Sequence, residues 1–453
     1  MAGAALLVPL AACDTEEILR VEDPTFASPE TLSSEAALPT LIAGAIGDFQ
    51  VGYSGAGGDS YLSVTGLIAD ELYSSGTFPT RTAVDQRDLF LGASGNTSDG
   101  AFTLLQRART SLNTAAQRVT EVGSAQDPRL AELRSLQAFT YVALGEAFCS
   151  GIPFSDAPNA TPGDLGQPLS TAETFQAAAG FFDQALAVNS GSNLGKVGKA
   201  RALLNNGQYQ DAAAAVAGVP TSFVYFIRHS INSGRQNNPI FSLMANRRYG
   251  QSNDEGNPDG PFANTIGEGE GLPFRAAMDP RTPFTGPVPG FDPVIPQFVS
   301  TLYPDFGTDV PLASGVEARL IEAEAAFQAD NFDMALGILN TLRASTPALL
   351  QVLFPEAPAG FGTALAPLTD PGTSAARADL IFRERGFWLY LTGHRQGDLR
   401  RLIRQYGRAQ SNVFPSGPYF KGGVYGNDVA FPIPFDEVNN TNFDLDQCNT
   451  KAA

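Results

Sequence analysis

Several residue types that carry chemistry are scarce in this chain. It has 453 residues, with two histidines, one tryptophan, three cysteines and four lysines, and its formal net charge is −18. Proteins that bind nucleic-acid phosphates need clustered Lys and Arg, so this composition argues against a nucleic-acid partner. With only His229 and His394, a Ser-His-Asp or Cys-His catalytic site is barely possible. We find neither a phosphate-binding glycine motif nor a Cys/His spacing typical of zinc. We therefore expect a protein that is not an enzyme.

Long apolar runs are also missing after the N-terminus, which predicts no membrane-spanning helix. The start is different, because Ala4–Ala12 form a short apolar run that ends in small residues before Cys13, as in an export signal. Leu10–Cys13 resembles the bacterial lipobox, whose cysteine is lipidated and anchors the protein in a bilayer. We expect a signal segment at 1–13, a tether at 14–30 that begins with four mostly acidic residues, and a helical domain at 31–453. The alternative is an alanine-rich start with an unmodified cysteine.

The two other cysteines are Cys149 and Cys448. In an exported protein with Cys13 modified, an even pair remains and a disulfide is allowed. The alternative is that Cys149 and Cys448 are two separate buried thiols. The sequence leaves this open, because it does not give the distance between them.

Helical periodicity dominates the rest of the chain. Apolar residues recur at helical spacing in a set of segments: Glu35–Tyr53, Tyr61–Tyr73, Ser98–Val122, Pro128–Phe148 and Thr171–Val188. Lys196–Val216 and Glu317–Arg343 each have the small-and-large pattern of a tetratricopeptide-type unit of about 34 residues. We predict an all-α fold, a tetratricopeptide-like helical repeat scaffold with long irregular loop insertions.

The predicted loops are rich in Gly, Pro, Asn and Asp. The largest is an insertion at about 220–315, and a loop that long is either functional or disordered. Phe78–Gly95 and Thr346–Gly372 are also predicted as loops, and Phe414–Cys448 as an extended segment.

Ile381–Arg401 holds the only tryptophan, one of the two histidines and five arginines. Thr373 or Ser374 is the expected N-cap of a helix over 375–392, and Gly393 suits the left-handed residue that ends it. This helix is apolar almost all round in its second half, which predicts burial. A second helix should follow from Gly397. Arginines near a core need partners, and Glu384 and Asp398 are the nearest carboxylates.

The sequence E-R-G-F-W-L-Y-L-T-G-H-R-Q-G-D-L-R-R, Glu384–Arg401, resembles the C-terminal signature of the SusD/RagB-like family of outer-membrane nutrient-binding lipoproteins. Other segments resemble family motifs, and all six occur in the family's order: Leu10–Cys13, Leu136–Leu144 with Gly151–Phe154, Asp279–Arg281, Glu317–Arg343, Glu384–Arg401 and Phe431–Pro434. One departure is the helix at Leu136–Leu144, which lacks the Arg-Ala pair of the family pattern.

The resemblance implies a lipid-anchored protein of the outer membrane that faces outside the cell. It also implies binding of a glycan or other nutrient and a position as a lid over a TonB-dependent outer-membrane β-barrel transporter. Two alternatives remain: a helical-repeat scaffold that binds only protein, and a surface glycosidase, although no pair of carboxylates is marked by its context.

Candidate ligand contacts are aromatic and arginine residues in loops, because sugars stack on exposed rings and offer hydroxyls to polar side chains. Tyr73, Phe78 and Arg81 flank the first loop, where the family's glycan platform resides, and Arg247, Arg248 and Tyr249 lie in the large insertion. The alternative for each aromatic residue is a ring tucked onto the protein body. Trp388 is expected in the core.

Oxygen ligands in the same insertion suggest calcium, which favours such loops. Asp254, Asn257 and Asp259, together with Glu255, are the candidates for a structural Ca²⁺ site. The later bidentate Glu of an EF-hand is missing, so the alternative is a solvated acidic loop. We expect no other cofactor.

Overall fold

The structure is a computed structural model. It describes residues 34–57, 59–155, 165–267, 269–358 and 362–453. The predicted signal segment, the tether and Cys13 lie outside the described residues. Within the described ranges, no helix is both long enough and apolar enough to cross a membrane.

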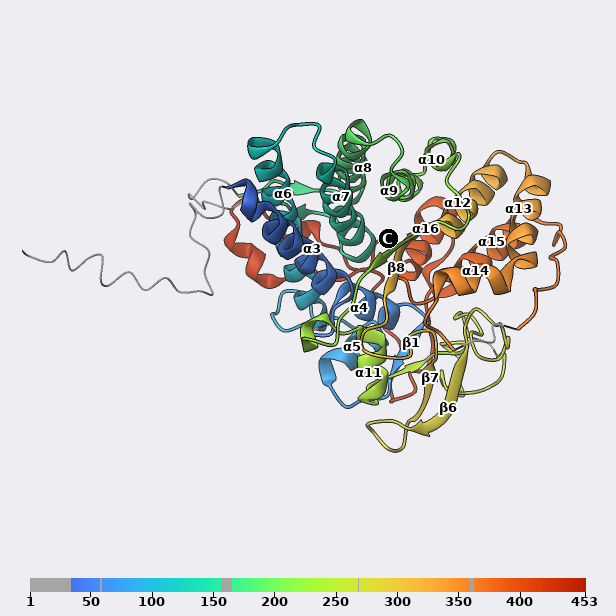
Figure 1. Ribbon diagram of the computed structural model, residues 1–453. Helices are drawn as coiled ribbons and strands as arrows, with labels where there is room; N and C mark the ends of the chain where they lie inside the picture. The colour runs from blue at the N-terminus through green and yellow to red at the C-terminus, as the bar shows by residue number, and fades with distance from the viewer. Residues whose placement is uncertain (1–33, 58, 156–164, 268, 359–361) are drawn as a thin grey trace, which may run out of the picture.

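Helices form most of the architecture, and they follow one another around an arc that fills the upper part of Figure 1. Those of the described chain are α3 (Leu38–Ser54), α4 (Tyr61–Ile68), α5 (Pro79–Gln86), α6 (Thr97–Val122), α7 (Arg129–Ala147), α8 (Thr171–Val188), α9 (Asn193–Asn205), α10 (Tyr209–Val216), α11 (Pro239–Ala245), α12 (Gly315–Gln328), α13 (Phe332–Ala344), α14 (Thr346–Leu353), α15 (Ser374–Trp388) and α16 (Arg395–Tyr406). Short 3-10 turns occupy Glu35–Ala37, Gly234–Gln236, Gln410–Asn412, Phe435–Asn439 and Leu445–Gln447. The predicted helical fold class is confirmed.

The two predicted repeat units are helix hairpins. The unit at Lys196–Val216 is α9 followed by α10, and the unit at Glu317–Arg343 is α12 followed by α13. The chain reverses at Gly207 and Asp330, which have φ values of +73° and +57° in the left-handed region. Buried alanines on α9 and α12 leave room for the neighbouring helices, which explains the small-and-large pattern.

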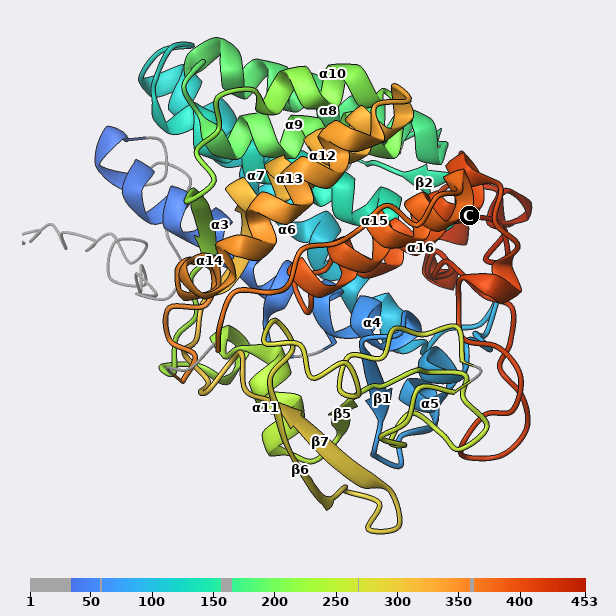
Figure 2. The same cartoon turned by 90° about the vertical axis from the view of Figure 1, so that its right-hand side faces the viewer.

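The strands are short and pair only in two-stranded antiparallel ladders. The ladders are β1 (Leu72–Ser74) with β5 (Tyr249–Gln251), β2 (Ile152–Pro153) with β3 (Pro168–Leu169), β4 (Val224–Ile227) with β8 (Val310–Ser314), and β6 (Phe284–Pro289) with β7 (Pro296–Ser300). The predicted insertion contains β4 to β8 and α11. In Figure 2 its β6–β7 hairpin projects from the lower edge, and β1 and β5 lie close to α5.

Four predicted boundaries were wrong. The helix predicted at Tyr61–Tyr73 ends at Ile68, because Leu72–Ser74 instead form strand β1 and pair with β5. The predicted loop at Phe78–Gly95 contains α5, which begins at Pro79 and ends at Gln86, followed by Arg87 as a left-handed C-cap residue with φ of +60°. An eight-residue helix has too few turns to show a clear apolar stripe. The predicted loop at Thr346–Gly372 begins with α14. The signature helix ends at Trp388, earlier than predicted, and Leu391 and Gly393 both adopt positive φ.

The signature itself is buried, as predicted. Trp388 lies in the core, and Thr373 caps α15 by accepting a hydrogen bond from Ala376 N. Asp398 binds Arg385 at 2.8 Å and Arg401 at 2.8 Å, both within the signature. Glu384 instead binds two arginines from elsewhere, Arg281 at 2.6 Å and Arg343 at 2.7 Å.

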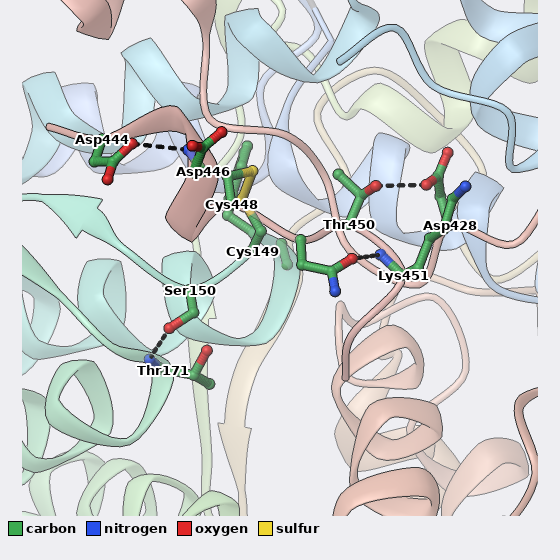
Figure 3. Close-up of a disulfide and its surroundings, with 12 residues drawn as sticks. Cys149, Ser150, Thr171, Asp428, Asp444, Asp446, Cys448, Thr450 and Lys451 are labelled. Atoms are coloured by element: carbon green, nitrogen blue, oxygen red, sulfur yellow. Dashed lines mark hydrogen bonds between the residues drawn. A yellow bond between two sulfur atoms is a disulfide. The ribbon is translucent and has the colours of Figure 1, made fainter. Parts of the chain in front are cut away.

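Cys149 and Cys448 form a disulfide that joins the end of α7 to the C-terminal segment (Figure 3). Their Cα atoms are 5.1 Å apart, and the two residues are 299 positions apart in the sequence. A backbone bridge between Phe148 and Phe431 runs beside this bond. The irregular segment after α16 is therefore held against the helical body at two neighbouring points.

Candidate functional site

The β1–β5 ladder brings the six predicted ligand-contact residues into one region. Tyr73 pairs with Gly250, and Ser74 pairs with Tyr249. Phe78 precedes α5 as its N-cap residue, and Arg81 lies in the first turn of that helix. Arg247 and Arg248 come directly before β5. Two loops that are far apart in the sequence thus meet at one end of a ladder.

Three side chains form a stack at the surface of this region. The guanidinium of Arg248 lies 4.6 Å from the ring centre of Phe78 and 3.3 Å from that of Phe291. Phe78 is 47% exposed and Phe291 is 48% exposed. We call Phe78, Arg248 and Phe291 the aromatic platform. Burial, and then the nearby charge of Arg81, lower the pKa of Arg248.

Hydrogen bonds to backbone carbonyls hold the loops of the platform together. Ser75 N donates to Arg248 O at 2.9 Å, and Phe291 N donates to Arg247 O at 2.8 Å. Lys421, from the C-terminal segment, donates to Gly76 O at 2.7 Å. These bonds link three separate loops and the C-terminal segment, so the two exposed rings stand on a fixed base.

Arg81 is tied to the base of the platform. It forms an ion pair with Asp59 at 2.9 Å, and its guanidinium lies 5.1 Å from the ring centre of Phe78 and 5.6 Å from that of Tyr249. Its charge is therefore partly satisfied inside the protein. Arg247 is exposed beside the stack.

Tyr73 and Tyr249 are fully buried. The hydroxyl of Tyr73 donates to Pro296 O at 2.6 Å and accepts from Phe298 N at 3.3 Å. Both rings are packed inside the protein, as the alternative to a ligand contact predicts, and the register places them on opposite faces of the ladder. Phe291 was missed from the sequence. Its position in a Gly-Phe-Asp-Pro turn of the large insertion is a signal that could have identified it.

The three calcium candidates lie in one hydrogen-bonded loop. The carboxylate of Asp254 accepts from Asn257 Nδ2 at 3.1 Å and from Gly267 N. Asn257 Oδ1 accepts from Asp259 N at 3.0 Å, and the Asp259 side chain is exposed. Hydrogen bonds from N–H groups of the protein thus occupy some of the oxygen atoms that would bind calcium. Over the described ranges, no group of three or more His, Cys, Asp or Glu residues is arranged to hold a metal ion. A structural Ca²⁺ stays a prediction.

Both histidines lie away from the aromatic platform. His229 contacts Gln50 at 3.0 Å and Ser54 at 3.1 Å, and burial lowers its pKa. His394 contacts Thr392 at 2.8 Å and Arg201 at 2.9 Å in the buried signature. Each has the hydrogen-bonded surroundings of a structural histidine.

The sequence matches no family model and no curated protein. Solved structures do resemble this chain. A laminarin-binding SusD-like protein has a TM-score of 0.60 and 15% identity, over 90% of this chain and 98% of that one. A SusD-like protein from Bacteroides fragilis has a TM-score of 0.63 and 14% identity, over 92% and 98% of the two chains. A SusD/RagB family protein from Bacteroides thetaiotaomicron has a TM-score of 0.60 and 12% identity, over 89% and 94%. The fold implied by the signature at Glu384–Arg401 is confirmed: this chain has the fold of SusD-like proteins.

Proposed function

We propose that this protein binds a glycan or other nutrient at the aromatic platform, as a lipid-anchored protein on the outside of the outer membrane. It caps a TonB-dependent transporter and delivers the ligand to it. The observation that carries the proposal is the platform itself, displayed at the edge of a SusD-like fold. Two proteins of similar structure, described as a laminarin-binding SusD-like protein and a SusD-like carbohydrate-binding protein, support it.

The chemistry of the platform suits a sugar. The C–H face of a pyranose packs against exposed aromatic rings, and its hydroxyls accept hydrogen bonds from donors at the ring edges. Phe78 and Phe291 supply two such rings, and Arg248 between them carries N–H donors. An acidic protein surface does not oppose a neutral ligand.

Binding without catalysis is the proposed activity. Glycoside hydrolysis needs two carboxyl groups that flank the scissile bond. Near the platform, Asp59 is bound by Arg81, and Asp292 Oδ1 accepts a hydrogen bond from Val294 N at 3.3 Å. The exposed ring stack beside these residues supports a ligand-holding role over a surface glycosidase.

Affinity electrophoresis in gels that contain single polysaccharides tests the ligand role. At least one neutral polysaccharide is expected to retard the wild type, and Phe78→Ala and Arg248→Gln should each weaken the affinity about three- to tenfold. Phe435→Ala is the matched control, because Phe435 is also exposed (39%) but lies in the C-terminal segment.

Each alternative has a distinct outcome. If no polysaccharide retards the wild type while a protein partner co-purifies, the protein is a scaffold without a small ligand. Release of shorter sugars during incubation would identify a glycosidase. Retardation that survives both platform substitutions would place the binding site elsewhere.

The anchor and the partner require separate tests. In cells that express the protein, radiolabelled palmitate should label the wild type and not Cys13→Ala. Membrane extracts of the native host should yield a large β-barrel that co-purifies with the wild type. Labelling that persists in Cys13→Ala would contradict the anchor, and purification without any barrel would contradict the transporter partner.

A further inference from the structure

A groove of about 350 Å³ separates the facing sides of α15 and α16. On α15 its walls come from Asp379, Phe382 and Arg383, at positions i, i+3 and i+4 of one helical face. On α16 they come from Arg395, Leu399 and Leu402, at positions i, i+4 and i+7. Leu272 of the insertion and Val413 after α16 complete the lining. The volume suits a small molecule.

Most charged groups that line this groove are already paired. Arg408 binds Asp379 at 2.6 Å, and Arg395 binds both carboxylate oxygens of Asp70, at 2.6 and 2.7 Å. Glu270 accepts two hydrogen bonds from Ser416, at 3.0 and 3.2 Å. Because these charged residues already have partners, they leave little unpaired charge in the groove.

Arg383 is different. In the part of the chain that the structure describes, its side chain has no hydrogen bond and no ion pair, and it stacks at 4.8 Å on the ring of Phe387. The adjacent carboxylate, Glu384, is used by Arg281 and Arg343. Arg383 is half-buried, and this burial lowers the pKa of its guanidinium.

The other arginines of the two helices make the contrast clear. Each has an acceptor: Arg377 binds Asp370, Arg385 and Arg401 bind Asp398, Arg395 binds Asp70, Arg400 donates to three backbone carbonyls, and Arg404 donates to Asn205 O. A partly desolvated cation without a partner is costly, and an anion from outside the protein would offset that cost.

We propose that the groove between α15 and α16 binds a small carboxylate-bearing molecule, whose carboxylate pairs with Arg383. The body of the ligand packs on Phe382, Leu399 and Val413. A planar carboxylate matches the two parallel N–H groups of a guanidinium. The chain's charge of −18 disfavours a long polyanion, so a ligand with a single carboxylate fits best. The site is formed by other elements than the aromatic platform and does not depend on glycan binding there.

Isothermal titration of the full chain tests this site with two matched pairs of probes. Galacturonate is compared with galactose, and benzoate with benzamide, because each pair differs in charge and little in size. At least one carboxylate should bind saturably, with its neutral partner at least tenfold weaker. Arg383→Gln should weaken the carboxylate at least tenfold, since a hydrogen-bonded charge pair is lost. Arg118→Gln should leave the affinity unchanged, because Arg118 is exposed on α6.

A second variant keeps the test decisive if Arg383→Gln fails to fold. Arg383→Lys keeps the charge and loses the paired N–H geometry, so its affinity should fall between those of the wild type and Arg383→Gln. The proposal is overturned if neither carboxylate binds, if the neutral partners bind equally well, or if a folded Arg383→Gln keeps wild-type affinity. Sulfate that competes with equal affinity would overturn the preference for a planar group.

Discussion

The arginines of the signature and the arginine of the aromatic platform have opposite surroundings. Arg385 and Arg401 are buried and share Asp398, and Arg401 also binds Glu324. Arg248 lies at the surface between two phenyl rings and has no carboxylate partner among the described residues. A fully buried charge needs a partner inside the protein, whereas a half-buried charge at the surface keeps part of its water. The first group therefore stabilises the fold, and the second has donors available to a ligand.

The Glu384–Arg401 signature, which identifies the fold, also connects distant segments of the chain to one another. Arg281 of the Asp-Pro-Arg segment binds Asp279 at 2.7 Å and Glu384 of α15 at 2.6 Å. Arg395 of α16 reaches Asp70, at the end of α4. These contacts join segments that are far apart in the sequence. The signature thus holds the helical arc to the insertion and to the N-terminal helices.

The largest expected loss of stability comes from breaking the buried ion pairs of the signature arginines. Asp398→Ala leaves Arg385 and Arg401 buried with one shared acceptor fewer, and the loss of one partner of a buried pair costs about 3–5 kcal/mol. Although burial acts to raise it, the two arginines hold the pKa of Asp398 well below its usual range. We expect urea denaturation to show this loss in the free energy of unfolding.

Glu121→Ala is the matched control for Asp398→Ala. Glu121 also binds an arginine, Arg118, at 2.7 Å, but both side chains are exposed on α6. Exposed pairs contribute about 0–1 kcal/mol, so this variant should unfold almost as the wild type does. Equal losses in the two variants would show that burial does not decide the strength of these pairs.

Removal of the disulfide should have the next largest effect. Cys149→Ala with Cys448→Ala frees the C-terminal segment, which also supplies Lys421 to the platform region. A disulfide that closes a long loop restricts the unfolded chain, and its loss costs about 2–5 kcal/mol. Thermal unfolding with and without reductant measures this change. A reductant effect on the double variant as large as that on the wild type would contradict this assignment.

Long periodic helices and the signature could be predicted from the sequence because burial imposes a regular pattern on them. The segments that became α6, α7 and α8 agree with their predicted ranges to within a residue or two. The positions of α9–α10 and α12–α13 followed from the spacing of small residues. Asp398 was a correct partner for the signature arginines because it lies one helical turn from Arg401.

The candidate site was harder to predict, since its geometry depends on the pairing of distant strands. The sequence marked Tyr73 and Tyr249 as loop aromatics, but the β1–β5 register turns both rings into the interior. The Gly-Phe-Asp-Pro turn marks Phe291 as a loop aromatic, but its place in the platform depends on a backbone bond to Arg247 of a distant loop. The unpaired state of Arg383 depends on which arginines reach Glu384. Exposure and partner choice are properties of tertiary contacts.

A pH-dependent prediction concerns Glu71, which lies beside the Arg395–Asp70 pair. Burial, and in smaller part the charge of Asp70, raise its pKa from 4.5 to about 8, against a lowering hydrogen bond from Leu391 N. Between these pH values the folded state holds a proton that the unfolded state has lost. The stability from this group is full below pH 4.5 and is lost as the pH rises through 8.

Glu71→Gln keeps the shape of the side chain and removes its titration. The free energy of unfolding of this variant, relative to the wild type, should rise with pH by up to about 1.4 kcal/mol per unit. Urea denaturation at pH 5, 6, 7 and 8 measures the difference. A difference that stays constant over this range would show that Glu71 does not titrate there.

The smallest effect on stability is expected from a substitution of Arg248 in the aromatic platform. Arg248→Gln removes two ring contacts at the surface, which contribute about 0.5–1 kcal/mol, and it leaves no buried charge without a partner. The free energy of unfolding should therefore change by less than about 1 kcal/mol, while retardation by the bound polysaccharide is lost or weakened. Arg385→Gln should give the reverse, a large loss of stability with unchanged affinity in the folded fraction, because Arg385 contacts Asp398 and not the platform. If Arg248→Gln unfolded as easily as Asp398→Ala, Arg248 would be a structural arginine, and the platform would lose its free donor.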